Sequence, residues 1–326
     1  MFPDVRLRRL RQNASIRKMI DMPLPGPEKF MWPTFVIDGE GTREEIESMP
    51  GQCRLSVDQL LMDLEPIAEA GIGSVLLFGL AEDSQKDSQG TEAFNENGAV
   101  QRAIRAVKKE CPDLVVAADA CVCAYTDHGH CGPLTESGAV DNDTSIANLA
   151  KICVSHAAAG ADIVAPSAMM DGQVQAIRGG LDANGLKNAI LMSYSTKFAS
   201  SMYGPFRDAE KSKPGQGDRK GYQASWGDLR SALRESEFDE AEGADMLMIK
   251  PSLFYLDILA RMREATDLPI AAYNVSGEYS MLQATAQRGW GDLKGMVQES
   301  TQAMVRAGAD ILISYWANQY NELFRD

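Results

Sequence analysis

Short apolar segments recur along the chain, and they limit its possible folds more than any other feature. Eight of them have the length and composition of buried strands: residues 34–37, 74–78, 114–118, 163–165, 190–194, 246–249, 270–273 and 311–314. Most follow a helical pattern that ends in glycine, as in LAKICVSHAAAGADIVAP and TQAMVRAGADILISY. Nearly continuous apolar runs are typical of parallel strands that are covered on both faces. Eight such units predict an α/β protein with a (β/α)8 barrel, or TIM barrel.

Two further features bear on this domain organisation. A doubly wound open sheet is the alternative fold, but we find no GxGxxG or Walker-type loop after the first strands. Residues 1–33 are basic and then proline-rich, and they do not fit the repeat. Their apolar side chains could dock on a neighbouring subunit, or the segment could be a flexible tail. We therefore expect an extended N-terminal arm for subunit packing over residues 1–33 and a catalytic barrel over residues 34–326.

The composition excludes several classes of function. The 326 residues carry a formal net charge of -14, which argues against nucleic acid or anionic membrane surfaces as general partners. No apolar run is long enough to span a membrane, and the N-terminus MFPDVRLRRLRQN does not resemble a signal peptide. We therefore expect a cytoplasmic protein.

Three cysteines lie close together directly after one predicted strand. Cys121, Cys123 and Cys131 stand in the segment DACVCAYTDHGHCG. Three thiolates suit zinc and leave a fourth coordination position for water or substrate, which is typical of a catalytic site. His128 or His130 could instead close the shell and make the site structural, and a redox-reactive loop is a further alternative.

Polar side chains follow six consecutive predicted strands, at the edge where barrel enzymes carry their active sites. They are Asp119, Ser167, Lys197, Lys250, Ser276 and Tyr315. Lys250 follows the apolar run Met-Leu-Met-Ile and precedes a proline, so burial is expected to lower its pKa, and a nearby Lys197 would act in the same direction. A neutral lysine can form a Schiff base with a carbonyl substrate. The alternative is a lysine whose stem packs on the rim while its ammonium reaches water.

A long charged segment, residues 208–223, follows the fifth predicted strand and has the composition of a mobile lid. Arg207, Arg219 and Lys220 would place cations there that suit a carboxylate substrate, although a solvated loop would have the same composition. Ser276 and Tyr315 could bind a second carboxylate through their hydroxyl groups.

Five motifs in order along the chain resemble the porphobilinogen synthase family, whose members are also called 5-aminolevulinate dehydratases. The motifs are DACVCAYTDHGHCG, MSYSTKFASSMYGPFRDA, GDRKGYQ, MLMIKP and YNVSGEYSM. The resemblance spans essentially the whole chain. It implies a barrel with an N-terminal arm, commonly assembled as a homo-octamer. It also implies the condensation of two 5-aminolevulinate molecules to porphobilinogen with loss of two waters, an early step of tetrapyrrole synthesis.

The resemblance also implies roles for individual residues. Lys250 resembles the lysine that forms the Schiff base with the substrate of the propionate side, and Lys197 resembles its partner in the other subsite. The residues implied to bind the first substrate's carboxylate are Ser276 and Tyr315, those for the second substrate are Arg207, Arg219 and Gln223, and those that line the same pocket are Asp119, Ser167 and Tyr203. Ala168 departs from the aspartate of many members.

Two metals are implied. Cys121, Cys123 and Cys131 resemble the zinc-dependent branch of the family, and Glu235 falls where many bacterial members hold an allosteric magnesium; an exposed helix carboxylate is the alternative for Glu235. Two other functions remain open from the residues themselves. A class I aldolase-type Schiff-base lyase would use one rim lysine but does not explain the three thiols. A non-enzymatic zinc-binding module does not explain the paired lysines.

Overall fold

Eight parallel strands close into a barrel in the computed structural model, which describes residues 3–325. Their order around the barrel is β1 (Phe30–Val36), β4 (Ser74–Gly79), β5 (Val115–Ala120), β6 (Ile163–Pro166), β7 (Ile190–Lys197), β8 (Met246–Lys250), β9 (Ile270–Asn274) and β10 (Ile311–Ser314). Strand β10 pairs back with β1, which closes the sheet. The predicted (β/α)8 barrel is therefore confirmed, and the open sheet is wrong.

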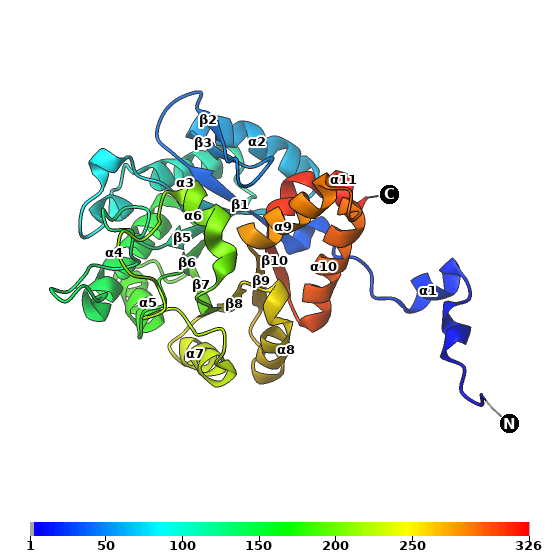
Figure 1. The fold of residues 1–326 in the computed structure, drawn as a ribbon. Coiled ribbons are helices and arrows are strands. Elements are labelled where there is room, and N and C mark those ends of the chain that lie inside the picture. The colour runs from blue at the N-terminus through cyan, green and yellow to red at the C-terminus, as the bar shows by residue number, and fades with distance from the viewer. Residues whose placement is uncertain (1–2, 326) are drawn as a thin grey trace.

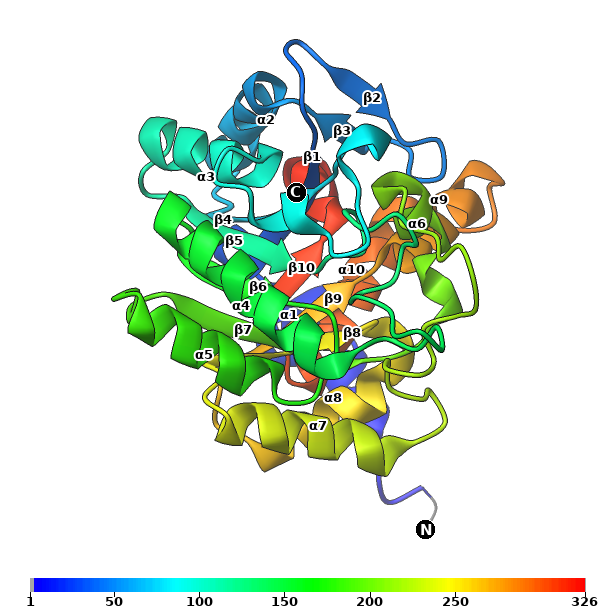
Figure 2. The same cartoon turned by 90° about the vertical axis from the view of Figure 1, so that its left-hand side faces the viewer.

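Helices surround the barrel on its outside (Figures 1 and 2). They are α2 (Val57–Glu69), α3 (Ala99–Glu110), α4 (Asn142–Ala159), α5 (Gln173–Ala183), α7 (Leu229–Ala241), α8 (Leu256–Ala265), α9 (Ser276–Gln287), α10 (Leu293–Ala307) and α11 (Tyr320–Phe324). A further short helix, α6 (Gly204–Glu210), lies at the barrel mouth, where its Phe206 packs with the inner side chains. A short antiparallel pair, β2 (Arg43–Glu45) and β3 (Cys53–Leu55), extends the sheet beside β1. Strand β1 starts at Phe30, earlier than the predicted segment 34–37. The predicted start was too late because Pro33 lies inside the strand, although proline usually marks a strand's end.

The repeated Gly-Ala-Asp motif has a structural role at the start of three strands. Its glycine ends a helical segment with positive φ, as at Gly160 (109°) and Gly308 (118°). Its aspartate accepts a hydrogen bond from the backbone of the preceding strand. Asp162 accepts from the Val116 N–H at 2.8 Å, and Asp245 and Asp310 make the corresponding bonds to β7 and β9. The motif thus joins each helix end to a neighbouring pair of strands.

Alternating side chains divide the apolar core into two layers. One layer lies inside the barrel and contains Phe35, Phe78, Tyr194, Tyr273 and Tyr315, among others. The other layer packs between the strands and the surrounding helices. Because side chains alternate along a strand, a polar residue that continues the inner set points into the barrel mouth.

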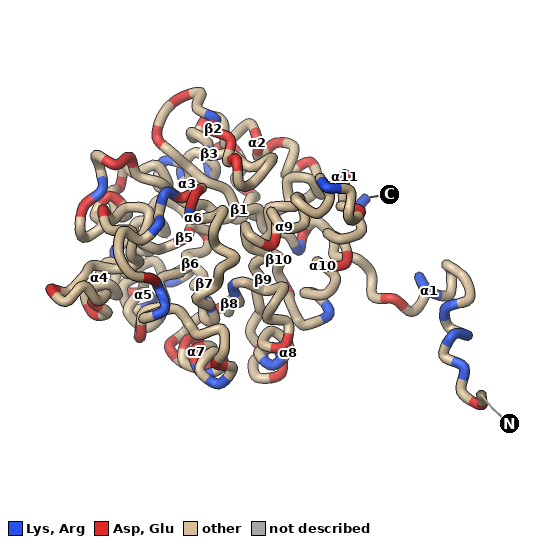
Figure 3. The backbone as a smooth tube through the Cα atoms, in the orientation of Figure 1, with Lys and Arg blue, Asp and Glu red and all other residues tan. Residues whose placement is uncertain are grey.

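The N-terminal segment, with α1 (Ala14–Ile20), extends away from the barrel (Figure 1). Neither α1 nor the short helix before it buries any residue. Leu7, Leu10 and Met19 are 67%, 54% and 77% exposed. Basic residues line this segment in Figure 3. No helix within residues 3–325 is long and apolar enough to cross a membrane.

Candidate active site

Lys197 and Lys250 lie at the ends of the neighbouring strands β7 and β8, where they are register partners. Both side chains are buried, with 5% and 2% exposure. Strict alternation along β7 would separate Lys197 from the inward-facing Tyr194, but the register shifts between Ser193 and Thr196. This irregularity turns Lys197 into the barrel, where its Nζ lies 5.6 Å from the centre of the Tyr194 ring. The structure therefore brings the two predicted lysines to one site.

Aromatic side chains enclose the ammonium group of Lys250. Its Nζ lies 4.1 Å from the ring centre of Tyr273, 4.6 Å from that of Phe206 and 5.1 Å from that of Tyr194. Burial, followed by the positive charge of Lys197, lowers the pKa of Lys250 to about 7. A substantial fraction of this amine is therefore neutral near neutral pH.

Two further predicted residues contact Lys197. Its Nζ donates a hydrogen bond to the Ser167 carbonyl oxygen at 2.5 Å, and the Ser167 hydroxyl donates to Asp119 at 3.1 Å. Burial raises the pKa of the Asp119 carboxyl, while Lys197 and Lys250 oppose that rise. Ala168, next to Ser167, is fully buried. Asp119 and Ser167 thus lie beside the paired lysines.

The three predicted cysteines form one buried cluster. The Sγ atoms of Cys121, Cys123 and Cys131 all lie within 4.8 Å of one another, and those of Cys121 and Cys123 are 3.3 Å apart. Hydrogen bonds from Cys121 and then from Cys123 hold the pKa of Cys131 well below the ordinary thiol range. Three thiols at this spacing can hold a soft or borderline divalent cation.

The two histidines of the loop make other contacts. His130 is 2.9 Å from the Gln216 carbonyl oxygen through Nε2 and 3.3 Å from the Tyr222 hydroxyl through Nδ1. The backbone N–H of His130 donates a hydrogen bond to His128 Nδ1 at 3.1 Å. Within residues 3–325, neither histidine belongs to the cluster of candidate metal ligands. The His130 ring therefore connects the cysteine loop to Gln216 and Tyr222, whereas His128 Nε2 is 3.3 Å from the Ser88 carbonyl oxygen.

The predicted lid lies folded against the cysteine loop. Arg219 is 5% exposed and donates from Nη2 to the carbonyl oxygens of Gly129 at 3.0 Å and Ser212 at 2.7 Å. Gly129 has a φ of 73°, and a Cβ there would lie 2.7 Å from the Lys213 carbonyl oxygen, so only glycine permits this approach. Burial lowers the pKa of Arg219, but the charge of Cys131 and of the other thiols outweighs it and raises that pKa well above its usual value.

Several buried polar atoms of the lid lack a hydrogen-bond partner within residues 3–325. They are Arg207 Nε, Arg219 Nε, and both Nε2 and Oε1 of Gln223. Buried polar groups are almost always paired, and exceptions are common where a ligand completes the network. The three donors among these atoms, on Arg207, Arg219 and Gln223 Nε2, therefore mark a place that can receive a polar ligand such as a carboxylate.

Tyr203, Tyr315 and Ser276 contact Lys250 or the residues that surround it. The Tyr203 hydroxyl donates to the Lys250 carbonyl oxygen at 2.9 Å, and the hydroxyl of Tyr315 lies 3.2 Å from that of Tyr273. The Ser276 hydroxyl accepts a hydrogen bond from the Phe206 N–H at 3.0 Å. Beside it, a Cβ on Gly277 would lie 2.4 Å from the Met202 carbonyl oxygen, so the start of α9 packs directly on the backbone before α6.

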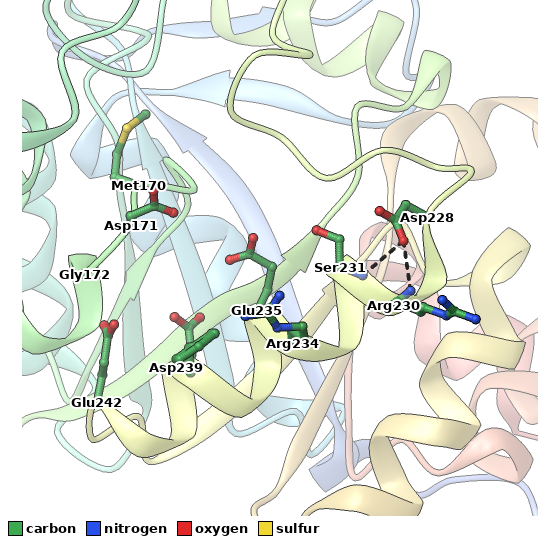
Figure 4. A pocket seen from close by; sticks show the side chains of 11 residues that line it. Met170, Asp171, Gly172, Asp228, Arg230, Ser231, Arg234, Glu235, Asp239 and Glu242 are labelled. Carbon is green, nitrogen blue, oxygen red and sulfur yellow. Dashed lines mark hydrogen bonds between the residues drawn. The ribbon is translucent and has the colours of Figure 1, made fainter.

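Glu235 lies on α7, beside a cavity of about 800 Å³. Asp171, Asp239 and Glu242 also line this cavity, as Figure 4 shows. Burial, followed by the charges of Asp171 and Glu242, raises the pKa of Glu235. Neither lysine lines this cavity.

Sequence reasoning missed Glu210 and the aromatic side chains around Lys250. Glu210 lies within the predicted lid, where a carboxylate in a charged segment gives no signal of burial. It is nevertheless 3% exposed, and burial raises its pKa to about 7. Alternation along β7 and β9 could have identified Tyr194 and Tyr273 as inward-facing.

Comparisons with known proteins give one consistent family. Residues 4–323 match the family described as Delta-aminolevulinic acid dehydratase. The Delta-aminolevulinic acid dehydratase of Synechococcus elongatus is 49% identical over 320 residues, which cover 97% of this chain and 98% of that protein. The protein of the same name from Escherichia coli is 49% identical over 312 residues, covering 96% of this chain and 95% of that protein.

A solved structure agrees with these matches. It is the delta-aminolevulinic acid dehydratase (porphobilinogen synthase) of Toxoplasma gondii in complex with the reaction product porphobilinogen. Its TM-score to this chain is 0.95 at 43% identity, with 98% of this chain and 91% of that chain covered. Neither the aldolase-type lyase nor the non-enzymatic zinc-binding module is favoured by these matches. The chain belongs to the delta-aminolevulinic acid dehydratase family.

Proposed function

We propose that this chain condenses two molecules of 5-aminolevulinate to porphobilinogen with loss of two waters, by means of Lys250 and Lys197. Family membership supports this lyase reaction. The observation that carries the assignment of residues is the register pairing of two buried lysines at the mouth of the barrel. The reaction consumes two ketones, and two lysines provide one amine for each.

Lys250 carries out the first covalent step in this proposal. Its neutral amine attacks the ketone carbon of one substrate, and the ketone oxygen leaves as water when the imine forms. A lowered pKa supplies the neutral amine, because protonated lysine has no lone pair for attack. When the substrate carbon later bonds to its partner molecule, the lysine leaves as a free amine. We place this substrate on the propionate side of the product.

Lys197 faces the second substrate in this proposal, with Asp119 and Ser167 beside it. The hydrogen bond from Lys197 to the Ser167 carbonyl oxygen orients the amine toward the same pocket. The second ketone oxygen also leaves as water. The product gains one carbon–carbon and one carbon–nitrogen bond between the two substrates, so atoms and electrons balance without an oxidant or reductant.

Two separate groups of side chains would bind the two carboxylates. We assign the first substrate's carboxylate to the hydroxyls of Ser276 and Tyr315, with Tyr203 lining the pocket. We assign the second carboxylate to Arg207, Arg219 and Gln223. Their unpaired buried polar atoms support this assignment, since a carboxylate would provide the missing acceptors for the two arginines.

The cysteine cluster is proposed to hold zinc. Three thiols within 4.8 Å of one another suit the ligand preferences of Zn²⁺, whereas Mg²⁺ prefers oxygen ligands. Zinc held by three protein ligands keeps a position open and, when bound, would polarise a carbonyl group or bind the substrate amine. Arg219 lies close enough for these thiols to raise its pKa, and this proximity links the lid to the metal site.

Glu235 is proposed to bind an allosteric magnesium ion. Asp171, Asp239 and Glu242 line the same cavity and supply the oxygen ligands that Mg²⁺ prefers. A second cavity of about 460 Å³ is lined by Glu235 and also by Tyr222 and Gln223 of the lid. An ion at Glu235 would therefore lie at the wall of a cavity that Gln223 also lines.

The chain is further proposed to assemble into a homo-oligomer, with an octamer as the expected form, and to work in the cytoplasm. The exposed apolar side chains between Val5 and Leu24 support docking on another copy. The basic residues of the same segment complement a chain whose net charge is -14. All six cysteines are free thiols, which suits a reducing compartment.

The test is an activity assay with and without a chelator. Reduced, zinc-loaded protein should convert 5-aminolevulinate to porphobilinogen, and a zinc chelator should abolish turnover. The matched variants are Cys123→Ala, which should lose both zinc and activity, and Cys111→Ala, which should keep both because Cys111 lies outside the cluster. The absence of product from intact zinc-loaded protein would refute the proposal.

A further inference from the structure

Glu210 is a buried carboxylate beside the cysteine cluster. It is the last residue of α6, and its side chain is 3% exposed. The Cys123 thiol donates to Glu210 Oε2 at 3.3 Å, and the Ser212 hydroxyl donates to the same oxygen at 2.6 Å. The carboxylate therefore has a fixed position next to one of the three candidate metal ligands.

No cationic side chain within residues 3–325 forms an ion pair with this carboxylate, although the charge of Arg219 acts on it and opposes the effect of burial on its pKa. None of the ion pairs within residues 3–325 involves Glu210. A buried carboxylate is unfavourable unless it is paired or lies beside a cation. Its place at the C-terminal end of a helix adds to this cost, because that end carries partial negative charge. A cation bound by the adjacent thiols would add positive charge next to Glu210 and favour its ionised form.

We infer that Glu210 is a positioning residue of the metal site, which orients Cys123 and strengthens the binding of a divalent cation by the three cysteines. This inference rests on the proposed metal site. Glu210 contacts one thiol and is not a member of the three-thiol group, so it acts beside the ligands. The hydrogen bond fixes the direction of the Cys123 side chain before the cation arrives. When the cation binds, the Cys123 proton is released to solvent, and the ionised carboxylate then attracts the cation in addition to the thiolates.

The test measures zinc affinity directly, by competition with a chromophoric chelator. Glu210→Gln keeps the shape of the side chain and removes its charge. This variant should bind zinc about 10- to 100-fold more weakly, which is the usual loss when a group that supports a metal ligand is removed. Asp208→Asn removes an exposed charge from the same helix and should change the affinity less than about two-fold. Ser212→Ala should weaken binding by a smaller factor than Glu210→Gln, because the carboxylate loses its anchor but keeps its charge.

Cobalt provides a second readout. Co²⁺-loaded Glu210→Gln should keep the thiolate-to-cobalt absorption band of the wild type at full loading, because all three thiolates remain. A change of the visible cobalt bands that signals a lost oxygen ligand would overturn the positioning role and make Glu210 a direct ligand.

The outcomes separate this inference from the proposed function. Equal zinc affinity in wild type, Glu210→Gln and Ser212→Ala would refute the role of Glu210 and leave the cysteine site intact. A wild-type protein that binds no zinc would refute the cysteine site itself, and the role of Glu210 with it. Should Glu210→Gln fail to fold, Ser212→Ala decides the question alone.

Discussion

Replacing Lys197 by methionine should raise the pKa of Lys250, because it removes the neighbouring positive charge that helps to lower that pKa. The Nζ atom of Lys197 lies 5.6 Å from the centre of the Tyr194 ring, and that of Lys250 lies 5.1 Å from the same point. The two Nζ atoms are therefore separated by at most the sum of these distances. At that separation two unit charges repel by about 1.5 kcal/mol in a medium of dielectric constant about 20, which corresponds to about one pKa unit.

The rate of imine formation should depend on pH, because only the neutral form of the Lys250 amine attacks the ketone. In the wild type the pKa of Lys250 is about 7, so the neutral amine predominates above that pH and imine formation slows below it. In Lys197→Met the midpoint should move upward to about 8. At about pH 6, formation of the Lys250 imine should then be about tenfold slower in the variant than in the wild type.

The assay uses levulinate, a keto acid that resembles the substrate but lacks its amine. Cyanoborohydride reduces the imine, and mass spectrometry of peptides follows the labelling of Lys250 across pH. The reported quantity is the midpoint, so a change in levulinate affinity does not imitate the effect. Lys109→Met removes an exposed lysine, 81% accessible at its side chain, and should leave the midpoint unchanged. An identical midpoint in wild type and Lys197→Met would refute the electrostatic reasoning.

Two further predictions concern the magnesium site and the arm. Glu235→Gln should abolish the stimulation of turnover by magnesium. The control Glu237→Gln, on the exposed side of α7, should retain this stimulation. Stimulation that persists in Glu235→Gln would place any magnesium effect elsewhere. Deletion of residues 1–22 should yield a smaller assembly by light scattering, because the exposed Leu7, Leu10 and Met19 are removed, while the circular dichroism of the barrel persists. An unchanged mass would show that the arm does not hold the subunits together.

The fold could be predicted from the sequence because its repeat is local. Most units carry their own helix end, a glycine and an apolar strand, and eight such units are the number that closes a (β/α)8 barrel. The positions at which the strands begin and end were predicted less accurately than the strands themselves. Pro33 concealed the start of β1, because the propensity of proline opposes a strand that the barrel nonetheless accommodates.

The candidate site was predictable only in part. Period-two alternation places Lys250 inside the barrel with Met248, but the same rule fails for Lys197, whose inward direction depends on the irregularity in β7. The proximity of the lysines to the cysteine loop follows from barrel geometry, since strand ends meet at one rim. Glu210 could not be predicted, because its burial results from contact between the lid and a loop about 87 residues earlier in the chain.

The central claim is that Lys250 forms a covalent imine with 5-aminolevulinate. Borohydride reduction of the protein in the presence of 5-aminolevulinate, followed by peptide mapping, tests this claim most directly. An adduct of substrate mass should form on Lys250, and it should form faster above about pH 7 than below it. Substrate trapped only on lysines outside the barrel, or turnover of the substrate by Lys250→Met at the wild-type rate, would contradict it.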